Sequence, residues 1–257
     1  MGKQILVVPD PHAHPSYSNV RADWLGRFIK ETKPDVVVNM GDHFDLPSLS
    51  SYDKGKSSFN GASYEKDINA GLDFQERMWS PMKKSKKKQP YKVVLEGNHE
   101  FRLKRALEYD PQLGGDKYGI SFRNFDFDSY YNEVIEYEGS GPGVWEYEGI
   151  SFAHFLVSGL MGRPIGGEHH AYSLLAKHHT SCVVAHSHTA DFAVRTDIRG
   201  RHMFGLVAGV FQDYIPKWCG QAGKMWWQGL VVLNDVEDGY FNPHFIGMRQ
   251  LQKEYGV

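Results

Sequence analysis

The chain contains the stretch Val93-Val94-Leu95-Glu96-Gly97-Asn98-His99-Glu100, in which an apolar run stops at a glycine and polar side chains follow at once. The apolar part predicts a short buried strand that ends in a turn. Gly97 permits a backbone conformation that a Cβ would obstruct. Asn98 offers an amide oxygen to a cation, and His99 can take up or release a proton near neutral pH. Taken alone, the pattern is more typical of a surface turn.

Four other predicted strands also end in polar side chains, and this repetition favours a functional site. These strands are expected at residues 5–8, 36–38, 150–153 and 182–185. The carboxyl ends of parallel strands lie on one edge of a sheet, so we expect the side chains that follow them to converge. The five groups are Asp10 and His12, Asp42 and Asp45, Asn98 and His99, His154, and His186 and His188.

Helical spacing of apolar residues separates these strands. It predicts helices over residues 20–30, 64–79, 101–109 and 168–179, with further strands over 203–210 and 229–233. Strand and helix in alternation indicate right-handed crossovers and a largely parallel sheet. We expect a single domain over residues 1–257. Residues 110–149 are less regular and are interpreted as an insertion near the pocket mouth, partly helical, with a hairpin around Trp145.

The expected ligands are carboxylate, amide and imidazole groups, without a thiolate. This mixture suits manganese, iron, zinc or nickel and contains too much nitrogen for a calcium or magnesium cage. Seven groups are too many for one ion and suit two ions that share a bridging carboxylate. Two metal ions ~3.5–4 Å apart form the clamp used for in-line displacement at phosphorus. The seven are Asp10, His12, Asp42, Asn98, His154, His186 and His188.

Five motifs, in this order, resemble those of the calcineurin-like metallophosphoesterases. The resemblance extends over residues 5–188, and the last strands are consistent with the second sheet of that family. It implies an α/β fold, a four-layer αββα sandwich of two mixed β-sheets flanked by helices. The motifs are Asp10-Pro11-His12, Gly41-Asp42-His43-Phe44-Asp45, Gly97-Asn98-His99-Glu100, His154, and Ala185-His186-Ser187-His188.

The resemblance also implies a role for each residue. His99 would be the histidine that binds no metal, contacts the phosphate and protonates the leaving oxygen, and Asp45 would orient it. Two divalent transition-metal ions are implied, with manganese expected first and iron, zinc or nickel as alternatives. One site would comprise Asp10, His12, Asp42 and His188, and the other Asp42, Asn98, His154 and His186.

Two departures from the family pattern bear on the substrate. Ala185 replaces the usual glycine of the last motif, and Leu46-Pro47 stands where the Ser/Thr protein phosphatases have Arg-Gly. The missing arginine counts against that branch, and the His-x-His ending resembles the phosphodiesterase and nuclease branches. We therefore expect hydrolysis of a nucleotide or nucleic-acid phosphodiester by in-line attack of a metal-bound hydroxide. The alternatives are a phosphomonoesterase of the same family and, from another class, a non-catalytic binding scaffold.

Three residues near the motifs are candidates for substrate contacts. Arg102 begins the helix after His99, and its guanidinium fork fits phosphate oxygens, although a solvated helix charge explains it equally well. His14 and His43 lie within ligand loops.

Aromatic residues could stack on bases near a groove mouth, although core packing explains such residues more often. The aromatic candidates are Trp145, Trp218, Trp226, Trp227, Tyr130 and Tyr131. Glu100 could contact the metal shell, and capping of the following helix explains it equally well.

Composition sets wider limits. The net charge of −2 gives no global attraction to nucleic acid or acidic membranes. The lysine-rich run at 83–88 enters the strand far from Asn98, which favours a solvated loop over a nucleic-acid contact. Cys182 and Cys219 cannot form a disulfide framework. The sequence shows no signal peptide and no apolar segment of the ~20 residues that a membrane span requires. We therefore expect a soluble cytoplasmic protein without membrane contact. No protein partner is indicated.

Overall fold

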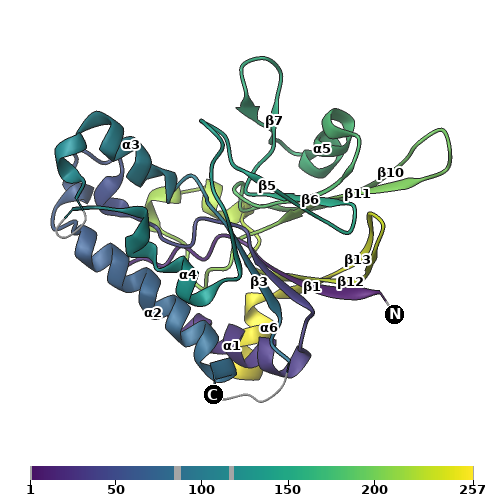
Figure 1. Cartoon of the computed structure of the whole chain (residues 1–257), viewed down its shortest axis with the longest axis horizontal. Helices are drawn as coiled ribbons and strands as arrows, with labels where there is room; N and C mark the ends of the chain where they lie inside the picture. Colours follow the sequence, from purple (N-terminus) through teal and green to yellow (C-terminus); the bar gives the residue numbers. More distant parts are fainter. Residues whose placement is uncertain (1, 84–87, 116–118, 257) are drawn as a thin grey trace.

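The computed structural model describes residues 2–83, 88–115 and 119–256 (Figure 1). Most of the lysine-rich run, residues 84–87, lies outside these ranges. In the described part of the chain, no helix is both long enough and apolar enough to cross a membrane.

The first sheet has the strand order β13-β12-β1-β2-β3-β4. Neighbours from β1 to β4 are parallel, while β12 lies antiparallel to β1 and β13 antiparallel to β12. The central runs 5–8 and 36–39 are buried throughout, as expected for strands covered on both faces. The strands are β1 (Lys3–Val8), β2 (Val36–Asn39), β3 (Tyr91–Leu95), β4 (Glu133–Ile135), β12 (Gly229–Glu237) and β13 (Tyr240–Gly247).

The second sheet has the order β10-β11-β9-β6-β5 and faces the first across an apolar core. Val7 and Val38 from the first sheet belong to one cluster with Phe152, Val183 and Leu206 from the second. Its strands are β5 (Val144–Tyr147), β6 (Ile150–Ala153), β9 (Ser181–Val184), β10 (Ala190–Thr196) and β11 (His202–Ala208); β7 (Val157–Ser158) and β8 (Arg163–Pro164) form a separate ribbon.

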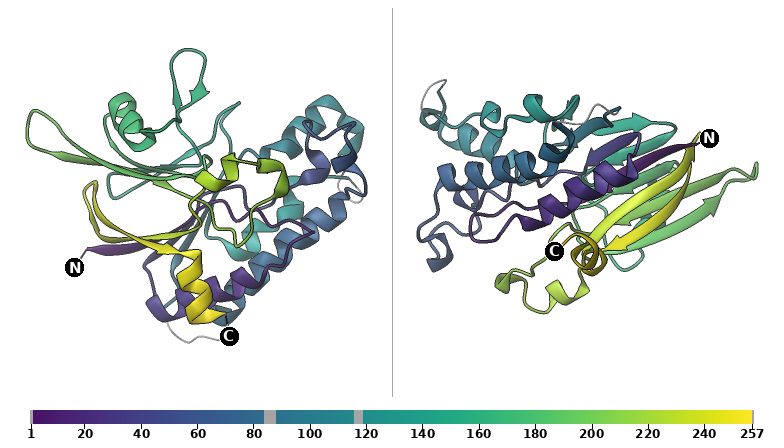
Figure 2. Two further views of the ribbon diagram at one scale, coloured as in Figure 1. Left: turned by 180° about the vertical axis from the view of Figure 1, so that it is seen from behind. Right: turned by 90° about the horizontal axis from the view of Figure 1, so that it is seen from below.

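Helices cover the outer faces of both sheets (Figures 1 and 2). One apolar cluster joins the strands of the first sheet to three helices, which are α1 (Val20–Thr32), α2 (Tyr64–Lys83) and α6 (Met248–Tyr255). Another apolar cluster joins the strands of the second sheet to α5 (His170–His178). The predicted four-layer sandwich of two mixed sheets is therefore confirmed. The remaining helices are α3 (Phe101–Tyr109), α4 (Phe127–Tyr130) and the short 3₁₀ turns Pro47–Leu49, Ser57–Phe59, Pro111–Leu113, Phe122–Phe125, Lys217–Cys219 and Ala222–Met225.

The placement of the last strands differs from the expectation. The strand predicted at 203–210 lies in the second sheet as β11, but the strand predicted at 229–233 pairs with β1 in the first sheet. Residues 110–149 contain α4, the parallel edge strand β4, and β5, which forms the expected hairpin with β6 around Trp145. The strands β4, β10 and β13 and the helix α6 were not predicted.

Candidate metal centre

The loops that follow β1, β2, β3, β6 and β9 meet at one edge of the sandwich. Backbone hydrogen bonds connect them, with the N–H of His12 donating to the carbonyl of Asp42 (2.8 Å) and the N–H of Ala185 donating to that of His154 (3.0 Å). Gly97 packs so closely on the Asp42 loop that a Cβ would lie 2.2 Å from Asp42 Oδ1. A glycine is required here for this close approach, and the groups from all five strand ends converge as predicted.

Five of the expected metal ligands have a left-handed backbone, which costs an ordinary residue roughly 1–2 kcal/mol. Such conformations concentrate at functional sites, where surrounding structure enforces them. Pro9 and Pro11 flank the first of these residues. The positive φ angles belong to Asp10 (38°), His12 (43°), Asp42 (48°), His186 (62°) and His188 (61°).

Two clusters of potential metal ligands result. In the first, Nε2 of His188 lies 3.1 Å from Nε2 of His12 and 3.3 Å from Oδ2 of Asp10. In the second, Nε2 of His154 lies 3.0 Å from Oδ1 of Asn98 and 3.2 Å from Nδ1 of His186.

Asp42 lies between the two clusters. Its Oδ2 is 3.7 Å from Nε2 of His12 and 3.3 Å from Nε2 of His154. Its Oδ1 accepts a hydrogen bond of 2.8 Å from the backbone N–H of His99, which fixes the carboxylate plane. This is the position that a bridging carboxylate requires.

The ligand sets fit divalent transition-metal ions. Two ligands that bind one ion at about 2.0–2.2 Å lie about 3 Å or more apart, and the separations within both clusters have this value. Oδ1 of Asp10 is buried and has no hydrogen-bond partner among the described residues. A cation would satisfy that oxygen, and the mixed imidazole and carboxylate ligands suit manganese, iron, zinc or nickel.

Comparison with known proteins agrees with this geometry. Residues 3–206 match the sequence model of the calcineurin-like phosphoesterases. The chain belongs to the calcineurin-like phosphoesterase family. It is also similar to the Gene 54 protein of Mycobacterium phage D29, with 25% identity over 262 residues that cover 96% of this chain and 94% of that protein. Members of the family are metal-dependent phosphoester hydrolases, and this phosphoesterase is one of them.

The buried charges of the phosphoesterase are strongly coupled. Burial opposes ionisation of Asp42, but His154 and His99 hold its pKa well below the usual range. Burial likewise opposes protonation of His154, and Asp42 together with Asp10 overcomes this and raises its pKa to about 9. Burial and the neighbouring His154 lower the pKa of His186 to about 4. The carboxylates of Asp42 and Asp10 therefore favour a positive charge at the position of His154.

His99 lies beside the clusters with both ring nitrogens engaged. Its Nδ1 is 2.7 Å from the backbone carbonyl oxygen of Asp45 and 3.0 Å from Oδ1 of the same residue. Nη2 of Arg102 donates a hydrogen bond of 2.9 Å to the Nε2 of His99. His12, Asp42 and His99 also have potential ligand atoms within 4.8 Å of one another. An arginine N–H directed at Nε2 occupies the lone pair that a metal ion would need, which favours the prediction that His99 binds no metal.

Asp45 contacts more than the predicted histidine. Its Oδ1 is also 2.9 Å from Nδ1 of His12, and its Oδ2 is 3.7 Å from Nε2 of His14. A single carboxylate therefore orients a ring of the first cluster and the ring of His99 together. His14 lines the adjacent cavity, as predicted.

The prediction for His43 was wrong. Its side chain is completely buried, within 2.8 Å of the Asn39 amide, and its ring packs against Phe44 and Phe74. Burial lowers its pKa to about 4. Because the turn at Asp42 directs the next side chain into the core, His43 cannot contact a substrate.

Sequence reasoning missed how two buried residues hold the loops. Glu100 neither approaches the clusters as a ligand nor caps α3, but accepts hydrogen bonds from the backbone N–H groups of Asp42 (3.0 Å), Gly97 (2.9 Å) and Phe44 (2.7 Å). Arg21 is also fully buried and donates to the carbonyl oxygens of Pro11 and Phe211. Gly97 lies only three residues from Glu100, but Asp42 and Phe44 lie more than fifty residues from Glu100, and Phe211 lies 190 residues from Arg21. No local pattern therefore indicates that these residues connect separate loops.

Glu100→Ala is expected to lower the free energy of unfolding by about 3 kcal/mol or more, since each buried N–H left without an acceptor costs about 1–3 kcal/mol. Glu100→Gln should be milder, because one amide oxygen can still accept two of the bonds. Denaturant titration followed by circular dichroism measures both. The exposed Glu168→Ala provides the control, and equal stability of all three variants would contradict this role.

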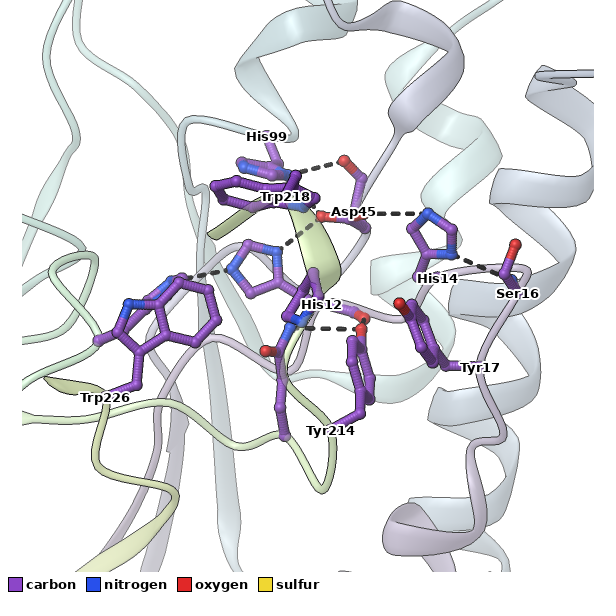
Figure 3. A pocket seen from close by; sticks show the side chains of 12 residues that line it. His12, His14, Ser16, Tyr17, Asp45, His99, Tyr214, Trp218 and Trp226 are labelled. Carbon is purple, nitrogen blue, oxygen red and sulfur yellow. Dashed lines mark hydrogen bonds and ion pairs between the residues drawn. The ribbon is translucent and has the colours of Figure 1, made fainter. Parts of the chain in front are cut away.

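A cavity of about 190 Å³ lies beside the first cluster and His99 (Figure 3). Its outer wall comes from the segment 209–228 between β11 and β12, which contributes Tyr214, Trp218 and Trp226. None of the described residues of 110–149, which were expected near the pocket mouth, lines this cavity, whereas Asp110 and Leu113 line a second cavity beside Arg102. Trp145 and Tyr131, considered above for base stacking, are buried and packed against neighbouring rings.

Proposed function

We propose that this phosphoesterase hydrolyses phosphodiester bonds of a nucleotide or nucleic acid at a centre of two divalent transition-metal ions, with manganese expected first. The observation that favours a diester is a pair of cavities next to His99 and Arg102. The cavity of about 190 Å³, called the aromatic cavity from here on because Tyr214, Trp218 and Trp226 form its outer wall, includes His99. A second cavity of about 370 Å³ is lined by Arg102, Arg105 and Lys54. A diester has two substituents, and each cavity can take one.

The metal ligands follow from the two clusters. Asp10, His12 and His188 would hold one ion, Asn98, His154 and His186 the other, and Asp42 would contact both. Bound ions supply charge neutralisation for the phosphoryl oxygens and lower the pKa of the attacking water. The chain contributes the spacing of these ligands and their burial, which excludes competing water.

His99 is proposed as the proton donor to the leaving oxygen. Arg102 donates to Nε2, so that nitrogen acts as an acceptor and Nδ1 donates to Asp45, which makes the ring neutral. A phosphate oxygen is a stronger acceptor than imidazole, and the guanidinium fork matches it. When the ester binds, Arg102 would move from Nε2 to a phosphate oxygen, and the freed Nε2 would take up a proton from solvent, which the carboxylates of Asp42 and Asp45 favour. Nε2 would then donate this proton to the leaving oxygen.

Arg102→Lys is expected to lower kcat/KM substantially although the charge is kept. The guanidinium donates to the carbonyls of Asp45 (2.8 Å) and Leu46 (3.3 Å) while contacting His99, and an ammonium cannot reproduce this planar fork. A loss of about tenfold to 100-fold corresponds to one or two charged hydrogen bonds. Steady-state kinetics with the exposed Arg249→Lys as the matched control measures it, and an unaltered kcat/KM for Arg102→Lys would exclude the role.

The reaction type is tested by comparing bis-p-nitrophenyl phosphate with p-nitrophenyl phosphate in the presence of Mn²⁺. We expect faster turnover of the diester, no turnover after chelation with EDTA, and recovery when Mn²⁺ is restored. A strong preference for the monoester would replace this proposal with a phosphomonoesterase. A metal-loaded protein inactive on both esters would favour the binding scaffold.

A further inference from the structure

The cavity beside the metal centre has an aromatic wall whose exposure core packing does not explain. Trp218 is 79% exposed, although tryptophan is among the side chains that gain most from burial. Its ring lies 6.1 Å from that of Trp226, at an interplanar angle of 69°. On another side of the cavity, Tyr17 and Tyr214 stack in parallel with centroids 3.7 Å apart. Figure 3 shows these four rings around His12 and His99.

The wall is attached directly to the ligand loops. The ring of Trp226 stands perpendicular to that of His188, with centroids 4.2 Å apart, and the N–H of Trp227 donates to the carbonyl of His188 over 2.9 Å. The hydroxyl of Tyr214 donates to the carbonyl of His12 over 2.9 Å. The rings of Trp226 and Tyr214 are therefore held in a fixed position relative to the site where a phosphate would bind, and Trp218 contacts this wall through Trp226.

The charges around this cavity indicate what it accepts. No lysine or arginine is among the described residues that line it, whereas the second cavity has Lys54, Arg102 and Arg105. Beyond the metal ion proposed at His12 and His188, a further phosphate would find no lysine or arginine to pair with among the described residues that line this cavity. A neutral, planar group fits this environment better.

Gln212 supplies a polar group at the same wall. Its side chain lines the cavity and is only 2% exposed, and its Nε2 lies 3.3 Å from the hydroxyl of Tyr214. Its Oε1 is buried and accepts no hydrogen bond from the described residues. Buried polar atoms are usually paired, so this oxygen lacks a hydrogen-bond donor, which an N–H of a bound molecule can supply.

We propose that the aromatic cavity binds the nucleobase of a substrate, which stacks against Trp218 and Trp226 and donates an N–H to Gln212. This inference rests on the proposed function and narrows its substrate class to phosphate esters that carry a nucleobase. Stacking accepts every base because every base has a π face. The site therefore selects for the presence of a base more than for its identity.

The test compares two labelled probes that differ only in their bases, a short thymidylate strand and an abasic strand of equal length. Their affinities are measured by fluorescence anisotropy on the full chain carrying His99→Ala, loaded with Mn²⁺, so that the strands stay intact. We expect the thymidylate strand to bind about tenfold more tightly. Adding Trp218→Leu should remove this difference by weakening thymidylate binding alone, and the exposed Tyr240→Leu should leave both affinities unchanged.

Unlabelled thymidine monophosphate as a competitor shows whether a free nucleotide or a strand is the better source of the base.

Equal affinities for the two strands before the tryptophan is changed would overturn the inference, as would an equal loss of both affinities in Trp218→Leu. Turnover of bis-p-nitrophenyl phosphate by the protein with His99 intact is measured separately. Activity on that ester with base-independent binding would overturn the base site and leave the phosphodiesterase. Base-dependent binding without activity on any ester would overturn the phosphodiesterase and leave the base site.

Discussion

Asp42→Asn is expected to abolish metal binding and hydrolysis together. Its Oδ1 accepts the backbone N–H of His99, and an asparagine oxygen can keep that bond. What disappears is the negative charge at Oδ2, which lies between His12 and His154. A metal clamp contributes several kcal/mol to the stabilisation of the transition state, so we expect the rate to fall about 10³-fold or more.

Metal content by mass spectrometry and turnover of bis-p-nitrophenyl phosphate measure the two effects of Asp42→Asn. The exposed Asp128→Asn is the matched control and should keep both. Thermal denaturation confirms that Asp42→Asn folds. Two bound ions in this variant, with an unaltered rate, would mean that Asp42 does not bridge the centre.

The sequence was sufficient to predict the edge where the expected ligands converge because each of them lies in the loop that follows a buried strand. Parallel pairing of β1, β2 and β3, and of β6 and β9, brings their carboxyl ends together without any information about side-chain packing. The same local reasoning failed for His43, whose direction depends on the turn at Gly41 and Asp42, with φ of 97° and 48°. Position in a ligand loop does not determine which way a side chain points.

Other features depend on contacts that no local pattern records. The hydrogen bonds of Glu100 to Asp42 and of Arg21 to Phe211 span 58 and 190 residues. The strand Tyr240–Gly247 contains Pro243, which argues against a strand, and is tolerated because β13 lies at the edge of the sheet. The segment 209–228 has no regular periodicity, so the exposure of Trp218 could only be found in the structure.

His99→Ala is expected to keep both metal ions and to lose about 10²–10⁴-fold in turnover of an ester with an alkoxide leaving group, such as a dinucleotide, which is the usual contribution of a general acid. The ring contacts Asp45 and Arg102, and its Nε2 remains 3.9 Å from Oδ2 of Asp42. The exposed His202→Ala is the control. Loss of one ion from His99→Ala would instead make His99 a ligand.

The dependence of this loss on the leaving group identifies the proton donor. A nitrophenolate departs readily without a proton, whereas an alkoxide such as a sugar hydroxyl departs only when protonated, so a missing general acid slows alkyl esters far more than aryl esters. We therefore expect His99→Ala to be impaired strongly on a dinucleotide and weakly on bis-p-nitrophenyl phosphate. Equal impairment on both substrates would show that His99 acts by binding the phosphate, because a lost phosphate contact is shared by every ester whatever group leaves.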